Sequence, residues 1–320
     1  MTQPLDIYLG PAAGIATSIL WTATSLSFTA AARRIGATLV NSLRIFMAAV
    51  LLGITHRLIF HTWVPHAADS QQIVFLAISG LLGLSIGDQA LFISYVDIGP
   101  RLAMLVMATS PILAALFAWA ALGEELGPWA LAGIALTVGG VAWVVLERPG
   151  ATRAMAPSHR VRGLTLALVA AILQAGGYLL SKKGIGHGWL PKAQHLDPQA
   201  AAFVRMFFAS LGMLPILAFR QFRRRNGGDR TLQPARKGSL REGLLLTGCG
   251  AVVGPFLGMW LSLVAADRAP LGVAQTLLSL PPILILPFAY FIHKETIGAR
   301  AILGALLAVG GATVLFFAPR

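Results

Sequence analysis

The chain has 320 residues, of which 56% are hydrophobic and only 12% are charged. Soluble domains carry about 25% charged residues, so this composition excludes an ordinary water-soluble protein. The formal net charge is +13, but the basic residues lie between apolar runs, which indicates membrane topology rather than nucleic-acid binding.

Ten apolar segments reach or approach the roughly 20 residues that a helix needs to cross a bilayer. In chain order they are 9–32, 38–55, 73–96, 102–122, 127–146, 163–181, 199–219, 244–266, 270–292 and 301–318. Residues 1–9 contain no Lys or Arg, so we expect the first segment to be a retained span and not a cleaved signal peptide. The sequence therefore predicts an all-α integral membrane protein with ten transmembrane helices.

The chain also repeats itself. The stretch Leu131-Ala-Gly-Ile-Ala-Leu-Thr-Val-Gly-Gly140 recurs 171 residues later as Ile302-Leu-Gly-Ala-Leu-Leu-Ala-Val-Gly-Gly311. Leu43-Arg-Ile-Phe-Met-Ala-Ala likewise matches Val204-Arg-Met-Phe-Phe-Ala-Ser. These matches divide the chain into two five-helix halves, 9–147 and 163–318. Because five is odd, the second half must enter the membrane from the opposite side, which predicts an inverted repeat with substrate bound between the halves.

The first half carries the residues of a family resemblance. It contains Gly87-Asp-Gln-Ala-Leu-Phe-Ile-Ser-Tyr-Val-Asp-Ile-Gly-Pro100, then Ser110-Pro-Ile-Leu, then a Leu122-Gly-Glu-Glu-Leu126 hairpin before a glycine-rich helix. In these residues the chain resembles the EamA family of the drug/metabolite transporter superfamily, whose members carry two such units. The resemblance implies a secondary transporter that exports or exchanges small metabolites, often amino acids or related compounds, by alternating access. We expect no cofactor.

Three charged residues lie inside the expected spans. Asp88 is the only carboxylate well inside one, about 12 Å from the end of its helix. An intramembrane carboxylate indicates function by default, so Asp88 is a candidate to bind a proton, a sodium ion or a substrate amine, with structural pairing as the alternative. Arg44 and Arg205 occupy matching positions in the two halves. Each either snorkels to the interface, or meets a substrate carboxylate or locks a gate.

Polar side chains form two matched stripes at helical spacing. The first stripe is Ser18, Thr22, Ser25 and Thr29 with Trp21 beside it, and the second is Gln174, Tyr178 and Ser181. Matched stripes predict the lining of a central water-accessible cavity, and hydroxyls that bond backbone carbonyls are the alternative explanation. Gln89 and Gln275 are weaker candidates for the same lining.

Prolines and glycines at matching positions predict bends and close packing. Pro111 in the first half and Pro281 and Pro282 in the second interrupt equivalent spans. Each proline frees the carbonyl four residues earlier, which suits a cavity wall or a gating hinge as well as packing. The small-residue series at positions 250, 254 and 258 favours close helix packing.

Residues near the expected helix ends point to structure. Glu124 and Glu295 lie in tight hairpins, and we interpret them as interfacial caps or partners of a nearby cation. His56, His61 and His66 recur every five residues, a spacing that does not place them on one helical face. We therefore predict no metal site.

Two other functional classes remain as alternatives. A flippase for a lipid or a lipid-linked sugar is the alternative within transport. An intramembrane aspartyl enzyme is more remote because that chemistry needs two carboxylates facing one water, and Asp97 and Asp267 fall at helix ends. The sequence has no Gly-x-x-x-x-Gly-Lys loop, so ATP-driven transport would need a partner chain. We expect a small-molecule substrate, a proton or sodium ion as coupling ion, no nucleic acid, and a monomer or homodimer in the cell membrane.

The distribution of Lys and Arg bears on orientation. The connections on one side of the membrane hold 17 of these residues and the other side holds six. Positive charge favours the cytoplasm, so the count places both termini outside. The proteins that this chain resembles more usually have both termini in the cytoplasm. We follow the charge count because it is a physical property of this chain.

Overall fold

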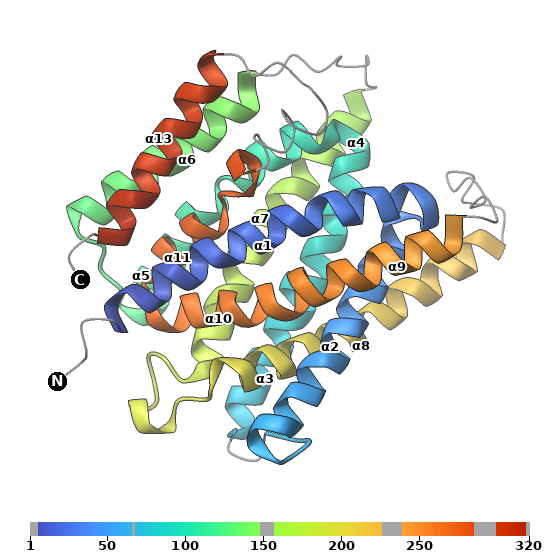
Figure 1. Ribbon diagram of the computed structural model, residues 1–320, viewed down its shortest axis with the longest axis horizontal. Coiled ribbons are helices and arrows are strands. Elements are labelled where there is room, and N and C mark those ends of the chain that lie inside the picture. Colours follow the sequence, from blue (N-terminus) through green and yellow to red (C-terminus); the bar gives the residue numbers. More distant parts are fainter. Residues whose placement is uncertain (1–5, 66–67, 148–156, 226–238, 285–298, 318–320) are drawn as a thin grey trace.

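The computed structural model describes residues 6–65, 68–147, 157–225, 239–284 and 299–317, and all regular structure in these ranges is helical. In chain order the elements are α1 Asp6–Ile35, α2 Ala37–Phe60, α3 Ser70–Ser79, η1 Gly80–Gly87, α4 Asp88–Met107, α5 Ser110–Leu122, α6 Pro128–Glu147, α7 Pro157–Ile185, η2 Lys192–Gln194, α8 Pro198–Arg225, α9 Ser239–Ala251, η3 Val252–Gly258, α10 Met259–Arg268, α11 Leu271–Leu278 and α13 Ala299–Phe317. The π-helical segments η1 and η3 lie in equivalent helices of the two halves, and each continues directly into the following α-helix (Figure 1).

Six of the described helices are long and apolar enough to cross a membrane. These are Tyr8–Ala32, Thr38–Phe60, Ser70–Ser94, Arg160–Ile185, Pro198–Phe219 and Leu240–Arg268. Four further apolar helices have 10–17 residues each, namely Ser110–Leu122, Pro128–Trp143, Leu271–Leu284 and Ile302–Phe317. Every one of these helices overlaps an expected span. The all-helical class is therefore confirmed, and the count of ten spans stays a prediction.

The connection expected at residues 97–101 is helical, so its prediction as a loop is wrong. α4 runs through Gly99 and Pro100 to Met107, and the chain breaks only at the following two residues. At the equivalent point of the second half, Ala269 is extended and ends α10. A residue before proline avoids the α conformation because its Cβ clashes with the proline ring. Ala269 follows this rule before Pro270, whereas Gly99 has no Cβ to clash.

The matched prolines do interrupt their helices. Pro111 lies in the first turn of α5, just after the break, and α11 ends at Leu278 before the paired prolines of the second half. Oγ of Ser18 donates a 2.5 Å hydrogen bond to the carbonyl oxygen of Leu277. This carbonyl lacks its helical partner because Pro281 has no N–H. The predicted break and the predicted freed carbonyl are both confirmed here.

Helices of one half pack against helices of the other. α1 lies along α9, η3 and α10, and α7 lies along α4, η1 and α3, so exchanging the halves leaves this pattern unchanged. Three further pairs join repeat mates: α2 with α8, α5 with α11, and α6 with α13. Figure 1 shows α6 and α13 side by side at one edge of the bundle. The main core cluster joins α2, α3, α7 and α8 through residues such as Leu52, Leu76, Tyr178 and Met206.

Repeat mates run antiparallel where the structure describes their register. Near the end of α2, Nδ1 of His56 lies 3.1 Å from Oε1 of Gln199, which is near the start of α8. Near the start of α2, Nδ2 of Asn41 contacts Sδ of Met213, which is farther along α8. The two halves therefore run in opposite directions across this interface.

The glycine series of α9, η3 and α10 packs against α1. A Cβ on Gly258 would lie 2.6 Å from Nε1 of Trp21, and a Cβ on Gly250 would lie 2.7 Å from the ring of Phe28. Gly254 meets α1 between these two contacts. Larger residues would force the helices apart, so the interpretation of the series as a packing feature is confirmed.

The two ends of the described chain meet. The ring of Tyr8 on α1 stacks on the ring of Phe316 on α13, with centroids 5.2 Å apart. The start of α1 and the end of α13 therefore lie on the same side of the bundle, as an even number of spans requires.

Candidate functional site

The intramembrane charges of the first half form a pair. Nη2 of Arg44 on α2 lies 2.5 Å from Oδ2 of Asp88, the first residue of α4 after the π-helical segment η1. Nε of Arg44 donates to Oδ1 of Asn41 at 2.8 Å. From α7, Nε2 of Gln174 donates to Oδ1 of Asp88 at 3.4 Å. The structure thus brings together three of the residues predicted from the sequence.

Arg44 points into the bundle and not toward the membrane surface. Its guanidinium lies 5.6 Å from the ring centroid of Phe28 and 5.7 Å from that of Phe92. The side chains of Arg44 and Asp88 are 19% and 11% exposed. Taking two charges out of water is costly unless further hydrogen bonds complete the pair, and the two amide side chains described above supply them.

Arg205 on α8 is completely buried, and one edge of its guanidinium lacks a hydrogen-bond acceptor among the described residues. Its guanidinium lies 4.5 Å from the ring centroid of Tyr178 on α7. Nη1 donates to Sδ of Met259 at 3.7 Å, which is a weak acceptor. Among the described residues, Nε and Nη2 make no hydrogen bond of good geometry, and the hydroxyl of Tyr178 is the one side-chain group that interacts with the guanidinium as an acceptor besides Met259. The snorkelling interpretation is wrong for Arg205, because its charge is held inside the bundle.

Two glycines pack closely against this edge. A Cβ on Gly83 of η1 would lie 3.0 Å from Nη2 of Arg205 and 3.5 Å from Oε1 of Gln174. A Cβ on Gly177 would lie 3.5 Å from the same Nη2 atom. Gln174 therefore reaches Asp88 with its nitrogen and the surroundings of Arg205 with its oxygen, so the two charged groups belong to one polar region.

Half of the residues predicted to bind substrate or ion carry a buried polar atom without a partner. Within the described ranges these atoms are Gln89 Oε1, Gln174 Oε1, Tyr178 Oη, Arg205 Nε, Arg205 Nη2 and Gln275 Nε2. Buried polar groups in proteins are normally hydrogen-bonded, and each exception needs an explanation such as a ligand or an ordered water. These atoms come from both halves of the chain.

Ser18, Thr22 and Ser25 of the α1 stripe each donate to a backbone carbonyl. Oγ1 of Thr22 donates to the oxygen of Ser18 at 2.7 Å, and Oγ of Ser25 donates to the oxygen of Thr22 at 2.7 Å. Trp21 is half-buried against the core and faces Gly258. The alternative structural explanation therefore accounts for these hydroxyl contacts, and a cavity lined by this stripe stays a prediction.

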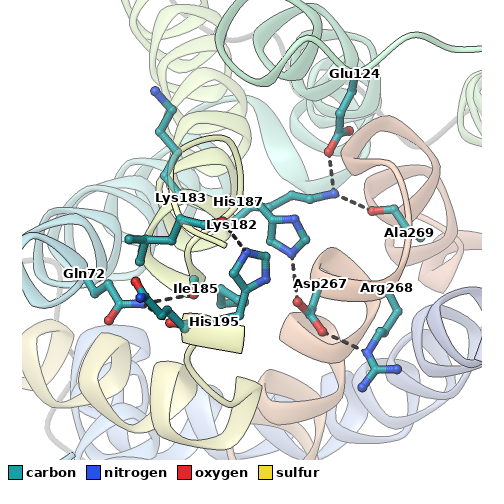
Figure 2. A network of polar contacts seen from close by, with 12 residues as sticks. Gln72, Glu124, Lys182, Lys183, Ile185, His187, His195, Asp267, Arg268 and Ala269 are labelled. Carbon is teal, nitrogen blue, oxygen red and sulfur yellow. Dashed lines mark hydrogen bonds and ion pairs between the residues drawn. The ribbon is translucent and has the colours of Figure 1, made fainter. Parts of the chain in front are cut away.

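A second polar network joins three helices at one end of the bundle (Figure 2). Oε1 of Glu124 lies 2.5 Å from Nζ of Lys182 on α7, and Oε2 accepts from the backbone nitrogen of Leu271 at 2.7 Å. Lys182 also donates to the carbonyl oxygen of Ala269 at 2.7 Å. Glu124 thus caps α11 and pairs with a cation, as predicted, while Glu295 lies outside the described residues.

Beside this network lies a histidine–carboxylate group. Nε2 of His187 is 2.8 Å from Oδ1 of Asp267, and Nε of Arg268 is 3.0 Å from Oδ2 of the same carboxylate. The ring of His195 lies 4.5 Å from that of His187, centroid to centroid. His187, His195 and Asp267 each offer one ligand atom, and these atoms lie within 4.8 Å of one another.

Sequence reasoning missed this group. Lys182 was expected as a connection charge, but its side chain is only 4% exposed. His187 and His195 lie in a polar connection, and their carboxylate partner is 80 residues away from His187 in sequence. The sequence also singled out three histidines that recur every five residues. His56 is buried with Gln199, His61 ends α2, and His66 lies outside the described residues.

The opposite end of α7 is held by another ion pair. Nε and Nη2 of Arg162 contact the two carboxylate oxygens of Asp97 on α4 at 2.7 and 2.6 Å. Arg162 and Lys182 lie about 30 Å apart along the axis of α7, which is about the thickness of the hydrocarbon core. Each end of this helix is therefore fastened by charge.

Comparison with known proteins assigns the family. The model of the EamA-like transporter family matches residues 8–146 and again residues 161–317, one match for each half. The chain belongs to the EamA family. As a member of the drug/metabolite transporter superfamily, this EamA protein is a multi-pass membrane protein of a transporter family.

The fold of this EamA protein is also found among solved structures. One of these, titled only "Crystal structure of protein", superposes with a TM-score of 0.71 over 95% of each chain at 20% sequence identity. At this identity the likeness shows the fold alone. No curated protein matches the chain.

Proposed function

We propose that this protein is a secondary transporter that moves a small carboxylate-bearing metabolite, such as an amino acid, across the cell membrane by alternating access. Its halves span the membrane as two inverted five-helix repeats with ten helices in all. The antiparallel contact between α2 and α8 supports the inversion. The meeting of Tyr8 and Phe316 supports the even number of spans.

The observation that carries the proposal is the edge of Arg205 that lacks a hydrogen-bond acceptor. Nε and Nη2 are the two nitrogens that bind a carboxylate side-on through parallel hydrogen bonds. In the described structure these are the two nitrogens without an acceptor. A buried guanidinium without an acceptor is unfavourable, and a substrate carboxylate would satisfy both nitrogens at once.

The charges around Arg205 favour the same class of substrate. Arg44 and Asp88 neutralise each other at 2.5 Å. The charge of Arg205 is not neutralised in this way, so the net charge of the three side chains is +1. A substrate carboxylate restores neutrality. The Oε1 atom of Gln174 lies beside the same edge and can accept hydrogen bonds, so it suits the amine of an amino acid.

Coupling to an ion is assigned to the pair of Asp88 and Arg44. When Asp88 binds a proton or a sodium ion, its attraction to Arg44 weakens and the contact between α2 and α4 loosens. Charged Asp88 holds the two helices together. An ion gradient can therefore act on helix positions at the centre of the protein.

The test is ligand-dependent thermal unfolding of the purified full-length protein. A ligand that binds only the folded state raises the unfolding temperature by mass action. We expect stabilisation by one or more free amino or organic acids and none by the corresponding methyl esters, which keep the shape but lose the negative charge.

Two variants make this test specific. Arg205→Lys retains the charge but loses the two-pronged edge, so the ligand-dependent shift should disappear. Arg34→Lys changes an exposed arginine that pairs with Glu242 at the surface, and it should keep the shift. Equal stabilisation by acids and methyl esters would exclude a carboxylate substrate. Stabilisation by lipid-linked sugars alone would favour the flippase alternative.

A further inference from the structure

We propose that His187, His195 and Asp267 form a binding site for a divalent transition-metal ion of the Zn²⁺ type, which fastens the end of α7 to the end of α10. His187 lies two residues after the last residue of α7, and His195 lies three residues before the first residue of α8. Asp267 is the second-last residue of α10, which packs along α1. Figure 2 shows the two imidazole rings beside each other, with the carboxylate opposite them.

The distances suit a metal after small movements. Tetrahedral Zn²⁺ with bonds of about 2.0–2.1 Å holds its ligand atoms roughly 3.3 Å apart. Nε2 of His187 and Oδ1 of Asp267 are now 2.8 Å apart, and the ligand atoms of all three residues lie within 4.8 Å of one another. A metal ion would take the place of the proton that His187 and Asp267 share, and would draw His195 inward.

His195 already has the outer contact of a metal-binding histidine. Its Nε2 lies 3.3 Å from the carbonyl oxygen of Leu190. If this nitrogen donates its proton to that carbonyl, Nδ1 keeps the lone pair that a metal needs. Metal-binding histidines in proteins commonly donate their second N–H to a carbonyl in this way, which fixes the tautomer and the ring orientation.

The backbone around His195 is shaped to admit the ring. Gly186 has φ 129°, a conformation that favours glycine, and a Cβ there would lie 2.7 Å from Cδ2 of His195. The carbonyl oxygen of Ile185 accepts hydrogen bonds from the backbone nitrogen of Leu196 at 2.8 Å and from Nε2 of Gln72 at 3.1 Å. The connection that carries both histidines is therefore held in place before any metal binds.

The site is open to ions and keeps one carboxylate oxygen for them. The side chains of His187 and Asp267 are 26% and 12% exposed. Arg268 contacts Oδ2 of Asp267, which leaves Oδ1 facing His187. Two imidazoles with one carboxylate favour Zn²⁺ and its neighbours over Mg²⁺ or Ca²⁺, which prefer oxygen ligands alone.

The site lies next to the network of Glu124 and Lys182. Asp267 is two residues from Ala269, whose carbonyl accepts the hydrogen bond of Lys182 in the network with Glu124. A metal bridging the connection after α7 and the end of α10 adds a strong link to this end of the bundle.

The test is Zn²⁺ binding to the purified full-length protein, carrying an affinity tag without histidine, measured by equilibrium dialysis. We expect one Zn²⁺ per chain in the wild type. His187→Asn and His195→Asn should each weaken binding by about tenfold or more, because even the loss of a group that only supports a metal ligand costs about 10–100-fold in affinity. The control is His61→Asn, an exposed histidine at the end of α2 whose φ of 58° asparagine tolerates. It should bind Zn²⁺ as the wild type does.

X-ray absorption at the zinc edge of the wild-type complex provides a measurement that does not depend on variants folding. It should show imidazole nitrogen ligands together with an oxygen. Zn²⁺ affinity unchanged in the His187→Asn/His195→Asn double variant would overturn the proposal, as would a wild-type spectrum without nitrogen ligands. Neither measurement involves transport, so its outcome is independent of the substrate proposed above.

Discussion

The guanidinium of Arg44 and the carboxylate of Asp88 face each other at 2.5 Å, joining the helix α2 to the residue at which η1 becomes α4. The sequence marked both residues as intramembrane charges without pairing them. Their contact makes Asp88 a group whose charge holds two helices together. Its structural and functional interpretations are therefore compatible, because an ion that neutralised Asp88 would also weaken its contact with α2.

Asp88→Asn should abolish uphill accumulation in reconstituted vesicles while the protein stays folded. The amide keeps the shape of the side chain but cannot alternate between charged and neutral states. Counterflow, which needs no ion gradient, should survive. Glu242→Gln removes an exposed carboxylate, 63% exposed, and should accumulate substrate normally. Normal uphill transport by Asp88→Asn at equal protein content would remove Asp88 from the coupling mechanism.

Arg205→Met should make the unliganded protein more stable and should eliminate ligand-dependent stabilisation. Replacing buried charge by an apolar side chain of similar volume is often stabilising, by about 1–4 kcal/mol. The measurement is thermal unfolding with and without ligand. Met206→Ala, next to it in the core, provides the comparison and should destabilise by about 2–5 kcal/mol. A loss of stability in Arg205→Met as large as that in Met206→Ala would show that Arg205 serves structure.

Glu124 and Lys182 should show strong coupling in a double-mutant cycle. Their side chains are 19% and 4% exposed, so removing one partner leaves the other charge buried and costs about 3–5 kcal/mol. Glu124→Gln and Lys182→Met should each lower the unfolding temperature, and the double variant should lose less than the two singles combined. The exposed pair of Arg34 and Glu242 should couple by about 1 kcal/mol or less. Additive effects at Glu124 and Lys182 would contradict a buried ion pair.

Local patterns in the sequence predicted several helix contacts and helix breaks of the fold. The spacing of Gly250, Gly254 and Gly258 predicted a close helix contact, and those residues do pack against α1. Prolines predicted the breaks before α5 and after α11 because a missing N–H acts on its own helix. The break in the first half was nevertheless misplaced at residues 97–101, since the absence of a Cβ at Gly99 lets α4 continue.

Contacts distant in sequence could not be predicted from one chain. Asp88, Arg44 and Arg205 were found because a charge inside an apolar run is conspicuous. The partner of each depends on how α2, α7 and α8 are placed in space. Lys182 and His187 follow the expected end of an apolar span, where polar residues are common, so their carboxylate partners gave no pattern to detect.

Cysteines at Gln174 and Thr22 should react with small hydrophilic thiol reagents, and a carboxylate substrate should slow the reaction. Both positions belong to the predicted cavity lining, although Thr22 bonds a backbone carbonyl in the structure. The exposed Cys249 must first be replaced by alanine. Leu168→Cys is the control. Leu168 lies on the same helix as Gln174, and its apolar side chain is exposed on the outside of the bundle. Cysteines as unreactive as that control would show that the stripes serve packing.

Both termini should lie outside the cell, because the connections on the opposite side hold 17 Lys and Arg residues against six on the side of the termini. Positive charge near span ends favours the cytoplasm. The contact between Tyr8 and Phe316 ties the two termini to one side, so a single reporter determines both. A C-terminal alkaline phosphatase fusion should be active, and a fluorescent protein fused at the same point should stay dark. Eight of the basic residues lie at positions 220–243, between two expected spans, and seven of them are arginines, so replacing those arginines by glutamine should weaken the preference. Bright cytoplasmic fluorescence without phosphatase activity would show instead that the termini lie inside, as in most proteins of this family.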